Sequence, residues 1–339
     1  MLTVRPVRTS DLPAIERLAQ ASGIGVTSLP NNREKLFERI QQSASAFEHE
    51  ATGDAGSEYY MFVLEQGGAV VGTASICASA GFDEPFYSYR SETAVHASRA
   101  LRVNNRIHVL NICHDLTGMA QLCGFYVDSG LEEAAAELMS RARLLFIASE
   151  RERFGRHIIA EMQGVHDDAG QSPFWNAIGR RFFNLDFLQV EQAFVSHSKT
   201  FIAELMPSYP IYVPLLPDEA QQAIGQIHPH FERVCRLLCN EGFEADNYLD
   251  IFDGGAVLTA EIDRLKTVEH SRTYPVEIQA ALPAQASLQL VSNQRLAGFA
   301  ATAARVAVVD GVAFINPDAA KALGVSSGDA VRIAGPQQA

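Results

Sequence analysis

The sequence lacks long apolar runs, an even set of cysteines and an excess of positive charge. No apolar run approaches the roughly 20 residues that a membrane-spanning helix needs, which excludes that class of protein. The five cysteines are odd in number and four lie in apolar runs, as free thiols in a reducing compartment do. No Cys or His follows them at zinc-finger spacing, and the first residues do not resemble a signal peptide. We therefore expect a cytoplasmic protein without a metal site.

Basic residues are too few for a protein that binds polyanions along its surface. Lys and Arg together number 27 and Asp and Glu together number 40, which gives a formal net charge of −13. Binding to nucleic acid or to an anionic membrane needs a local or overall excess of Lys and Arg, so both partners are disfavoured. The acidic excess fits either plain solubility or a site for a cationic substrate, and the charge alone does not choose between them.

The 339 residues suggest about two domains, since about 150 residues per domain is a common size. Alternating apolar residues predict strands, and apolar residues three and four apart predict helices. The predicted strands cover residues 2–7, 59–65, 69–78, 107–113, 122–127, 157–163, 200–205 and 247–252. The predicted helices cover residues 12–22, 131–150, 172–183, 218–224 and 231–241. The Ala, Pro and Gln content of residues 274–287 indicates a linker or a surface crossing, and residues 305–334 predict a small β-rich segment.

The order of the first elements is strand, helix, hairpin, central strand, helix, strand and helix. This order is similar to that of the GNAT-type acyl-coenzyme A N-acyltransferases. It implies an α/β (α+β) fold with two acyltransferase-like halves and a small β-rich C-terminal segment. We expect an N-terminal GNAT-like domain at residues 1–190, a second half at 191–275, and a linker with the β-rich segment at 276–339.

Eight strings of the sequence carry a more specific resemblance. They are GVTSLP (25–30), DEPFYSYR (83–90), VHAS (95–98), HDLTG (114–118), SPFW (172–175), FIAELMP (201–207), GQIHP (225–229) and YLDIFDGG (248–255). In this order, the series resembles the arginine N-succinyltransferase family. The resemblance covers about residues 1–275 and extends more loosely into the tail.

The resemblance implies a reaction, a co-substrate and two site residues. The family transfers a succinyl group from succinyl-CoA to the α-amine of arginine and, in some members, of ornithine, with no tightly bound cofactor. His228 matches the proton donor of the family, and an imidazole can exchange protons near neutral pH. Phe125 lies where the family binds succinyl-CoA through the main chain of the central strand. A structural histidine before Pro229 is the alternative for His228.

The loop before the long helix departs from the family pattern. The family carries Trp-Arg and then Gly-x-Gly there, whereas residues 128–136 of this chain read DSGLEEAAA. Glu132 and Glu133 suit the positive end of a helix but repel phosphate. This departure resembles the alpha chains of the two-subunit form, which pair with a beta chain that keeps the glycines. Two hypotheses follow: a catalytic alpha chain, or a non-catalytic scaffold or regulatory chain whose acyl-CoA loop has degenerated.

Charged residues in the matched strings are candidates for holding the amino-acid substrate. Carboxylates of the succinyl group and of the substrate need cationic partners, for which the guanidinium of Arg90 is the candidate. The guanidinium of arginine needs carboxylates, and Asp250 and Asp253 are the candidates. Aspartate before glycine also commonly forms turns, so a purely structural role for this pair is the alternative.

Overall fold

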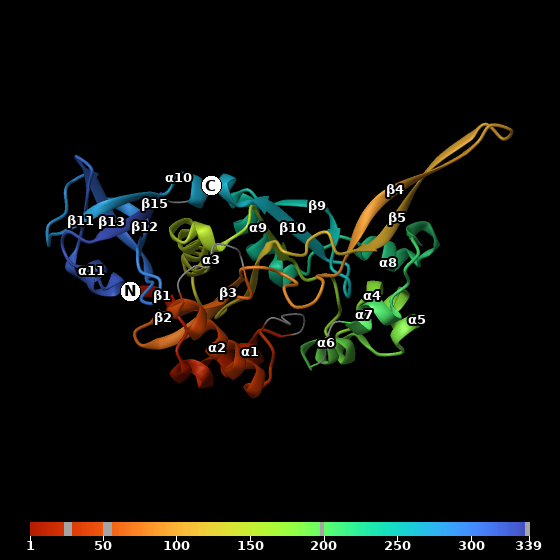
Figure 1. The fold of residues 1–339 in the computed structure, drawn as a ribbon, viewed down its shortest axis with the longest axis horizontal. Coiled ribbons are helices and arrows are strands. Elements are labelled where there is room, and N and C mark those ends of the chain that lie inside the picture. The colour runs from red at the N-terminus through yellow and green to blue at the C-terminus, as the bar shows by residue number, and fades with distance from the viewer. Residues whose placement is uncertain (24–28, 50–55, 197–199, 336–339) are drawn as a thin grey trace.

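The computed structural model describes residues 1–23, 29–49, 56–196 and 200–335. Residues 25–28 of the GVTSLP string lie outside the described residues. The molecule is elongated, with a small β-rich unit at one end, a sheet covered by helices in the middle, and a two-stranded arm projecting from the other end (Figure 1). The strands form one continuous sheet in the order β12-β15-β11-β14-β13-β1-β2-β3-β6-β7-β10-β9-β4-β5-β8.

The N-terminal elements form one side of the central sheet. They are β1 (Leu2–Pro6), α1 (Leu12–Ala21), α2 (Arg33–Glu48), β2 (Tyr59–Gln66) and β3 (Ala69–Cys77). In α1 the apolar residues recur three and four apart, and this face is buried: Leu12, Ile15, Leu18 and Ala19. Gly67 and Gly68 both have positive φ and close the β2–β3 hairpin as the sequence predicts.

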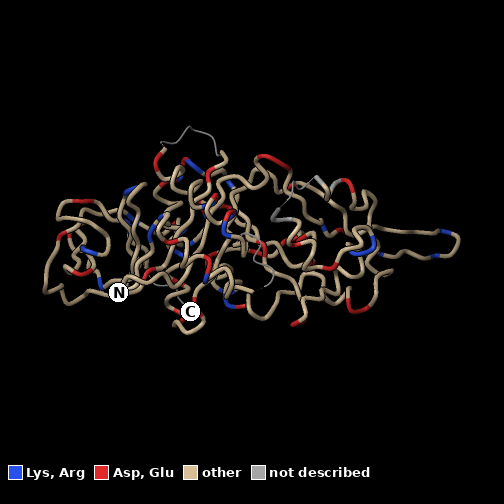
Figure 2. Tube along the Cα trace, turned by 90° about the horizontal axis from the view of Figure 1, so that it is seen from below, with Lys and Arg blue, Asp and Glu red and all other residues tan. Residues whose placement is uncertain are grey.

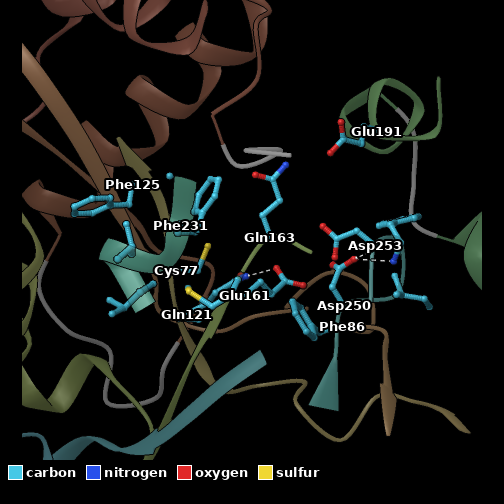
Figure 3. Close-up of a pocket in the computed structure, with 18 of the residues that line it drawn as sticks. Cys77, Phe86, Gln121, Phe125, Glu161, Gln163, Glu191, Phe231, Asp250 and Asp253 are labelled. Carbon is cyan, nitrogen blue, oxygen red and sulfur yellow. Dashed lines mark hydrogen bonds between the residues drawn. The ribbon is translucent and has the colours of Figure 1, made fainter. Parts of the chain in front are cut away.

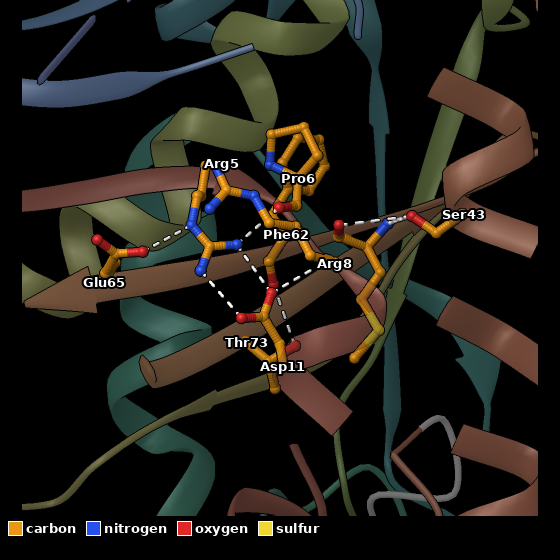
Figure 4. Close-up of polar contacts among 9 residues, drawn as sticks. Arg5, Pro6, Arg8, Asp11, Ser43, Phe62, Glu65 and Thr73 are labelled. Atoms are coloured by element: carbon orange, nitrogen blue, oxygen red, sulfur yellow. Dashed lines mark hydrogen bonds and ion pairs between the residues drawn. The ribbon is translucent and has the colours of Figure 1, made fainter. Parts of the chain in front are cut away.

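Buried polar contacts fix the start of the chain against the hairpin. The Arg5 guanidinium forms ion pairs with Asp11, at 2.8 Å, and with Glu65 on β2, at 2.7 Å (Figure 4). The Asp11 carboxylate also accepts a hydrogen bond from the backbone N–H of Arg8, at 2.7 Å. These contacts hold β1 in register and orient the entry into α1.

The centre of the molecule contains the expected long helix, two further helices and four strands. The elements are β6 (Ala120–Val127), α3 (Glu133–Ser149), β7 (His157–Glu161), α9 (Glu232–Glu241), β9 (Glu244–Leu249), β10 (Ala256–Glu261) and α10 (Lys266–His270). Most residues of α3 are buried, because the sheet, α9, α10 and the C-terminal strands all pack against it. Rings of Phe47, Tyr60, Phe62, Phe146 and Phe299 meet edge to face in this core.

A group of short helices packs around a second core at the arm side. They are α4 (Pro173–Ala177), α5 (Gly179–Phe183), α6 (Phe187–Ser196), α7 (Thr200–Leu205) and α8 (Asp218–Ala223). Trp175 is fully buried there, and its indole N–H donates to the Leu185 carbonyl at 2.9 Å. The predicted helix over residues 172–183 is interrupted at Ile178. Phe182 is exposed rather than in the core.

The strand predicted over residues 200–205 is wrong, because this segment is helix α7. Its buried side chains are Ile202 and, just beyond the helix, Met206, which lie four residues apart. A spacing of four places both side chains on one face of a helix and buries them in the second core. In so short a segment, alternation and helical spacing are hard to distinguish from sequence.

The arm consists of β4 (Ser88–Ser98) and β5 (Val103–Cys113), which pair along their whole length. At the base of the arm, β4 pairs with β9 and β5 pairs with the short strand β8 (Ile211–Tyr212). Strands from the two predicted acyltransferase-like halves therefore alternate within one sheet. The division at residues 190 and 275 stays a prediction.

The C-terminal unit is a closed barrel of five strands with one helix. The elements are β11 (Arg272–Ile278), β12 (Ser287–Asn293), β13 (Ala301–Val309), β14 (Val312–Ile315), α11 (Pro317–Leu323) and β15 (Ala330–Ala334). The pairs β13–β12, β12–β15, β15–β11, β11–β14 and β14–β13 close the ring. The linker predicted from residue 274 is wrong at its start, because β11 is a strand of this barrel despite Pro275.

Across the described residues, no helix is long and apolar enough to cross a membrane. The same residues contain no group of three His, Cys, Asp or Glu side chains that could hold a metal ion. All five cysteines are described, and all are free thiols. Cys235 and Cys239, four apart on α9, face each other with 3.8 Å between their sulfur atoms.

Candidate active site

The site begins where two parallel strands of the sheet separate. Strands β6 and β7 pair only at Ala120–Ile158 and Gln121–Ile159. Beyond this point β6 continues to pair with β3, and β7 pairs with β10 on its other side. The edges of β6 and β7 that face each other therefore diverge, and residues of both strands line the cavity that opens between them.

A β-bulge re-aims the chain of β6 in this opening. Ser75 of β3 lies opposite Cys123 and Thr73 lies opposite Tyr126, so two residues of β6 face the single residue Ala74. One of the two is Gly124, whose φ of +58° is the left-handed conformation that glycine adopts readily. The other is Phe125, the predicted acyl-CoA contact, and both line the cavity.

The cavity has a volume of about 360 Å³ and two chemically different ends. Near β6 its wall carries aromatic, thiol and arginine side chains, namely Arg39, Tyr59, Cys77, Cys123, Phe125, Arg143 and Phe231. The other end is acidic, with Glu161, Glu191, Asp250 and Asp253 (Figure 3). Gln121 and Gln163 lie between the two ends in Figure 3. Such a cavity suits a ligand that is elongated and a second ligand that is cationic.

The structure brings Asp250 and Asp253 together at the acidic end, as the sequence suggested. Asp250 Oδ1 accepts hydrogen bonds from the backbone N–H groups of Phe252 and Asp253, at 2.7 and 2.8 Å. The Asp253 carboxyl accepts from the N–H groups of Gly164 and Gly255, both at 2.8 Å. Burial raises the pKa of Asp253 well above its usual range, and the neighbouring Asp250 carboxylate raises it further. Both aspartates thus shape the turn after β9 and face the cavity.

Glu161 and Glu191 join the acidic end, and the sequence analysis did not identify either. Glu161 is the last residue of β7, and its carboxylate accepts a hydrogen bond from Gln121 Nε2 of β6 at 2.8 Å. Glu191 lies on α6, more than 50 residues from either aspartate in the sequence. Glu161 could have been noticed as a carboxylate ending an otherwise apolar strand, but nothing in the sequence marks Glu191.

His228 lies beside the cavity without lining it. Its backbone N–H donates to the carbonyl of Gln163, which does line the cavity, at 2.8 Å. The His228 ring stacks on His166, with ring centroids 4.4 Å apart and an interplanar angle of 16°. His228 Nδ1 accepts a hydrogen bond from the backbone N–H of His230 at 3.3 Å, so the proton of the neutral ring is assigned to Nε2.

His166 is a neighbour of His228 that the sequence analysis missed. Its Nδ1 atom lies 2.9 Å from the Asp167 carbonyl oxygen, and its Nε2 atom lies 2.8 Å from Gln163 Nε2. Because a carbonyl only accepts, Nδ1 carries the proton and Nε2 accepts from the Gln163 amide. The His166 ring is therefore held between two fixed partners. Its position is not recognisable from the string Gly-Val-His-Asp.

Arg90 does not reach the cavity. Its guanidinium forms ion pairs with Glu92, at 2.8 Å, and with Asp115, at 2.6 Å. The hydrogen bond to Asp115 is the main cause that raises the pKa of Arg90. Tyr248 donates a hydrogen bond to the same Asp115 carboxylate at 3.3 Å. Arg90 thus lies in an exposed cluster at the base of the arm, and its role in holding a substrate carboxylate stays a prediction.

The loop before α3 also lacks the form of a phosphate cradle in three dimensions. Glu132 is the N-cap residue of α3, and Glu133 is its first residue. Glu133 forms an ion pair with Arg236 of α9 at 2.6 Å, and Arg233 of α9 donates to the Glu132 carbonyl at 2.9 Å. Two arginines of another helix therefore lie at this helix start, where the glycine loop of the family would supply backbone N–H groups.

A bulged strand that separates from its parallel neighbour and leads into a helix is the arrangement of GNAT-type acyl-CoA N-acyltransferases, so the predicted α/β fold class is confirmed. The protein-family model described as arginine N-succinyltransferase beta subunit matches residues 2–267 of this sequence. The family model described as the C-terminal domain of that subunit matches residues 272–335. The chain belongs to the arginine N-succinyltransferase family.

Two chains of Pseudomonas aeruginosa show how this protein relates to the two subunits of that family. It is 48% identical to the arginine N-succinyltransferase subunit alpha over 98% of this chain and 99% of that one. It is 39% identical to subunit beta, over 98% and 97% of the two chains. A solved structure of arginine/ornithine succinyltransferase subunit AI of the same organism superposes with a TM-score of 0.90. That match has 45% identity and covers 99% of this chain and 98% of the other.

Proposed function

We propose that this chain is the alpha subunit of an arginine N-succinyltransferase and transfers succinyl from succinyl-CoA to the α-amine of arginine in arginine catabolism. The observation that carries the proposal is the cavity itself. It places the open edge of bulged β6, which can pair with the amide groups of an acyl-CoA arm, next to four acidic side chains that suit a guanidinium. We place the enzyme in the cytoplasm, in keeping with its free thiols.

The proposed reaction needs a base, an acid and a defined position for each substrate. Asp250 and Asp253 bind the guanidinium of arginine, and Phe125 contributes main-chain contacts to succinyl-CoA. The neutral α-amine attacks the thioester carbonyl and forms a tetrahedral intermediate. His228 accepts the proton that the amine nitrogen loses and delivers it to the departing coenzyme A thiolate. The C–N bond forms as the C–S bond breaks, so neither a covalent enzyme intermediate nor a tightly bound cofactor takes part.

The second candidate is a scaffold or regulatory chain of the same complex. The observation that favours it is the start of α3, which lacks the paired glycines that would bind a pyrophosphate and carries Glu132 and Glu133. Carboxylates at this point repel the phosphates of coenzyme A. In that case a beta chain with an intact loop would carry out the whole reaction.

Succinyl-CoA binding and arginine succinylation distinguish the two candidates. The chain is purified alone and with a beta subunit, and binding is measured by calorimetry and product by mass spectrometry. We expect succinyl-CoA to bind the isolated chain, and arginine or ornithine to be succinylated by the complex. A chain that binds no succinyl-CoA, within a complex that remains active, would leave only the scaffold.

The partner subunit is proposed to contact the arm formed by β4 and β5. Three apolar side chains are exposed near its tip: Val95 by 61%, Leu101 by 76% and Val103 by 40%. Three arginines, Arg99, Arg102 and Arg106, lie in the same region, where Figure 2 shows basic residues at the end of the arm. A basic tip on a chain that carries −13 overall is complementary to an acidic surface of the partner, and this chain is itself acidic.

Replacing Leu101 with serine and Arg102 with glutamate is expected to weaken this assembly. The double variant removes apolar contact area and reverses one charge, while the paired strands of the arm remain hydrogen-bonded. Light scattering at micromolar concentration, with and without the beta subunit, gives the mass of the assembly. Leu215→Ser, which alters a residue 83% exposed outside the arm, serves as the control. An unchanged mass for the arm variant would exclude the arm from the interface.

A further inference from the structure

Arg143 is a buried cation that forms an ion pair with no carboxylate among the residues that the structure describes. It lies on α3 with 1% of its surface exposed. Its Nη1 and Nη2 atoms reach the Ser75 carbonyl and Ser140 Oγ only at 3.4 and 3.5 Å, the outer limit of a hydrogen bond. The Nε atom is buried and has no hydrogen-bond partner within the described part of the chain. Burial lowers the pKa of Arg143 to about 10, so the side chain is still charged at neutral pH.

Arg141, two residues earlier on the same helix, shows how a buried arginine is normally accommodated. It is 4% exposed and forms ion pairs with Glu241, at 3.0 Å, and Glu137, at 2.7 Å. Its Nη2 atom also donates to the Gly335 carbonyl at 2.7 Å. Burying a charge without such partners is costly, so an uncompensated guanidinium indicates that an anion completes the site from outside the chain.

The position of Arg143 identifies which part of a ligand could supply that anion. Arg143 lines the cavity, and its guanidinium carbon lies 5.2 Å from the ring centroid of Phe125, on the bulge of β6. Arg143 lies ten residues after the start of α3 at Glu133, which is about 15 Å along the helix axis. A pyrophosphate bound at the start of α3 is therefore too distant. The anion that meets Arg143 belongs to the acyl end of the ligand.

We propose that Arg143 binds the free carboxylate of the acyl group and thereby selects a dicarboxylic acyl thioester over an acetyl or other uncharged acyl thioester. The inference deepens the proposed function and rests on it. The planar guanidinium can offer its Nε–H and Nη–H groups together to a carboxylate. No bond is made or broken by Arg143, so it is a specificity-determining residue and takes no part in proton transfer.

The test compares ligands that share coenzyme A and differ only in the acyl group. The full chain, alone and in complex with its beta subunit, is titrated with succinyl-CoA, acetyl-CoA and coenzyme A. For Arg143→Met we expect the Kd of succinyl-CoA to rise by about 10- to 100-fold, while the other two values change less than about two-fold. Arg143→Lys keeps a charge but not the fork and should lie between the two.

The control and the opposing outcomes separate this inference from the function on which it rests. Arg141→Met removes a buried arginine that does not line the cavity, and it should lower stability without changing the ratio of succinyl-CoA to coenzyme A affinity. Arg143→Met should unfold no more easily than the wild type, since it removes an unpaired buried charge. A wild-type chain that binds acetyl-CoA and succinyl-CoA equally, or an Arg143→Met chain that weakens all three ligands alike, overturns the carboxylate subsite only. A wild-type chain that binds none of them overturns the proposed function as well.

Discussion

Replacing His228 with alanine is expected to lower kcat for arginine succinylation by about 10²- to 10⁴-fold, the usual contribution of a positioned acid or base. The backbone N–H of His228 donates to the Gln163 carbonyl, which holds the residue beside the cavity, and the hydrogen bond to ring Nδ1 leaves Nε2 to exchange protons. The KM values should change little, because the role proposed for the ring is proton transfer and not substrate binding. Steady-state kinetics on the complex with its beta subunit measures both constants.

His230→Ala is the matched control for this variant. His230 is exposed; alanine retains its backbone N–H bond to His228 and removes only the edge contact of the two rings, whose centroids lie 4.8 Å apart. We expect its kcat to stay within a few-fold of the wild type. Full activity of a complex that carries His228→Ala would remove the catalytic role from this histidine and would favour the scaffold candidate.

The pH profile gives an independent readout of the same residue. Burial, and then the charges of His166 and His230, lower the pKa of His228 below 6.5, while Asp168 opposes them. His228 is thus neutral at pH 7, and the acidic limb of kcat/KM should lie below pH 6.5. His166→Gln removes a ring that disfavours protonation of His228 by charge repulsion, so the limb should move toward pH 6.5. A limb that stays in place would show that another group controls it.

The parts of this protein that follow from sequence are those in which local pattern and burial agree. The β2–β3 hairpin has turn glycines, and the long helix α3 has apolar spacing, and each pattern points to one structure. Strand β4 has a largely polar sequence in an exposed arm, so no alternation marks it. Strand β11 contains Pro275, which indicates a loop when tertiary pairing is unknown.

The candidate site was only partly predictable, for reasons of distance along the chain. Asp250 and Asp253 belong to a recognisable turn string, and the structure brings them to the cavity. Arg143 reaches the same cavity from α3, which the sequence predicts only as a long helix. Glu191 reaches it from α6, a helix that the sequence analysis did not predict. The importance of Arg143 arises because no carboxylate in the described part of the chain pairs with it, and only the three-dimensional packing around α3 shows this.

Replacing Glu241 with alanine is expected to lower the free energy of unfolding by about 3–5 kcal/mol, the usual cost of breaking a buried ion pair. The Glu241 side chain is fully buried at the end of α9. Its oxygens accept from the backbone N–H and the hydroxyl of Thr267, each at 2.8 Å, and pair with Arg141 Nε at 3.0 Å. Truncation leaves the Arg141 charge inside α3 without its buried counter-charge. Urea denaturation followed by circular dichroism measures the loss.

Glu244→Ala, an equivalent truncation at an exposed position of β9, should change stability by less than about 0.5 kcal/mol. The double variant Glu241→Ala with Arg141→Met tests the mechanism more directly. If the unpaired charge causes the loss, the double variant should be more stable than Glu241→Ala alone, since both charges are then gone. If the stability loss of the double variant equals the sum of the losses of the two single variants, the unpaired charge is not the cause. The effect of Glu241→Ala is then assigned to its hydrogen bonds with Thr267. Arg141 also donates to the Gly335 carbonyl after β15. Arg141→Met and the double variant both lose this hydrogen bond, so both should loosen the C-terminal barrel against α3.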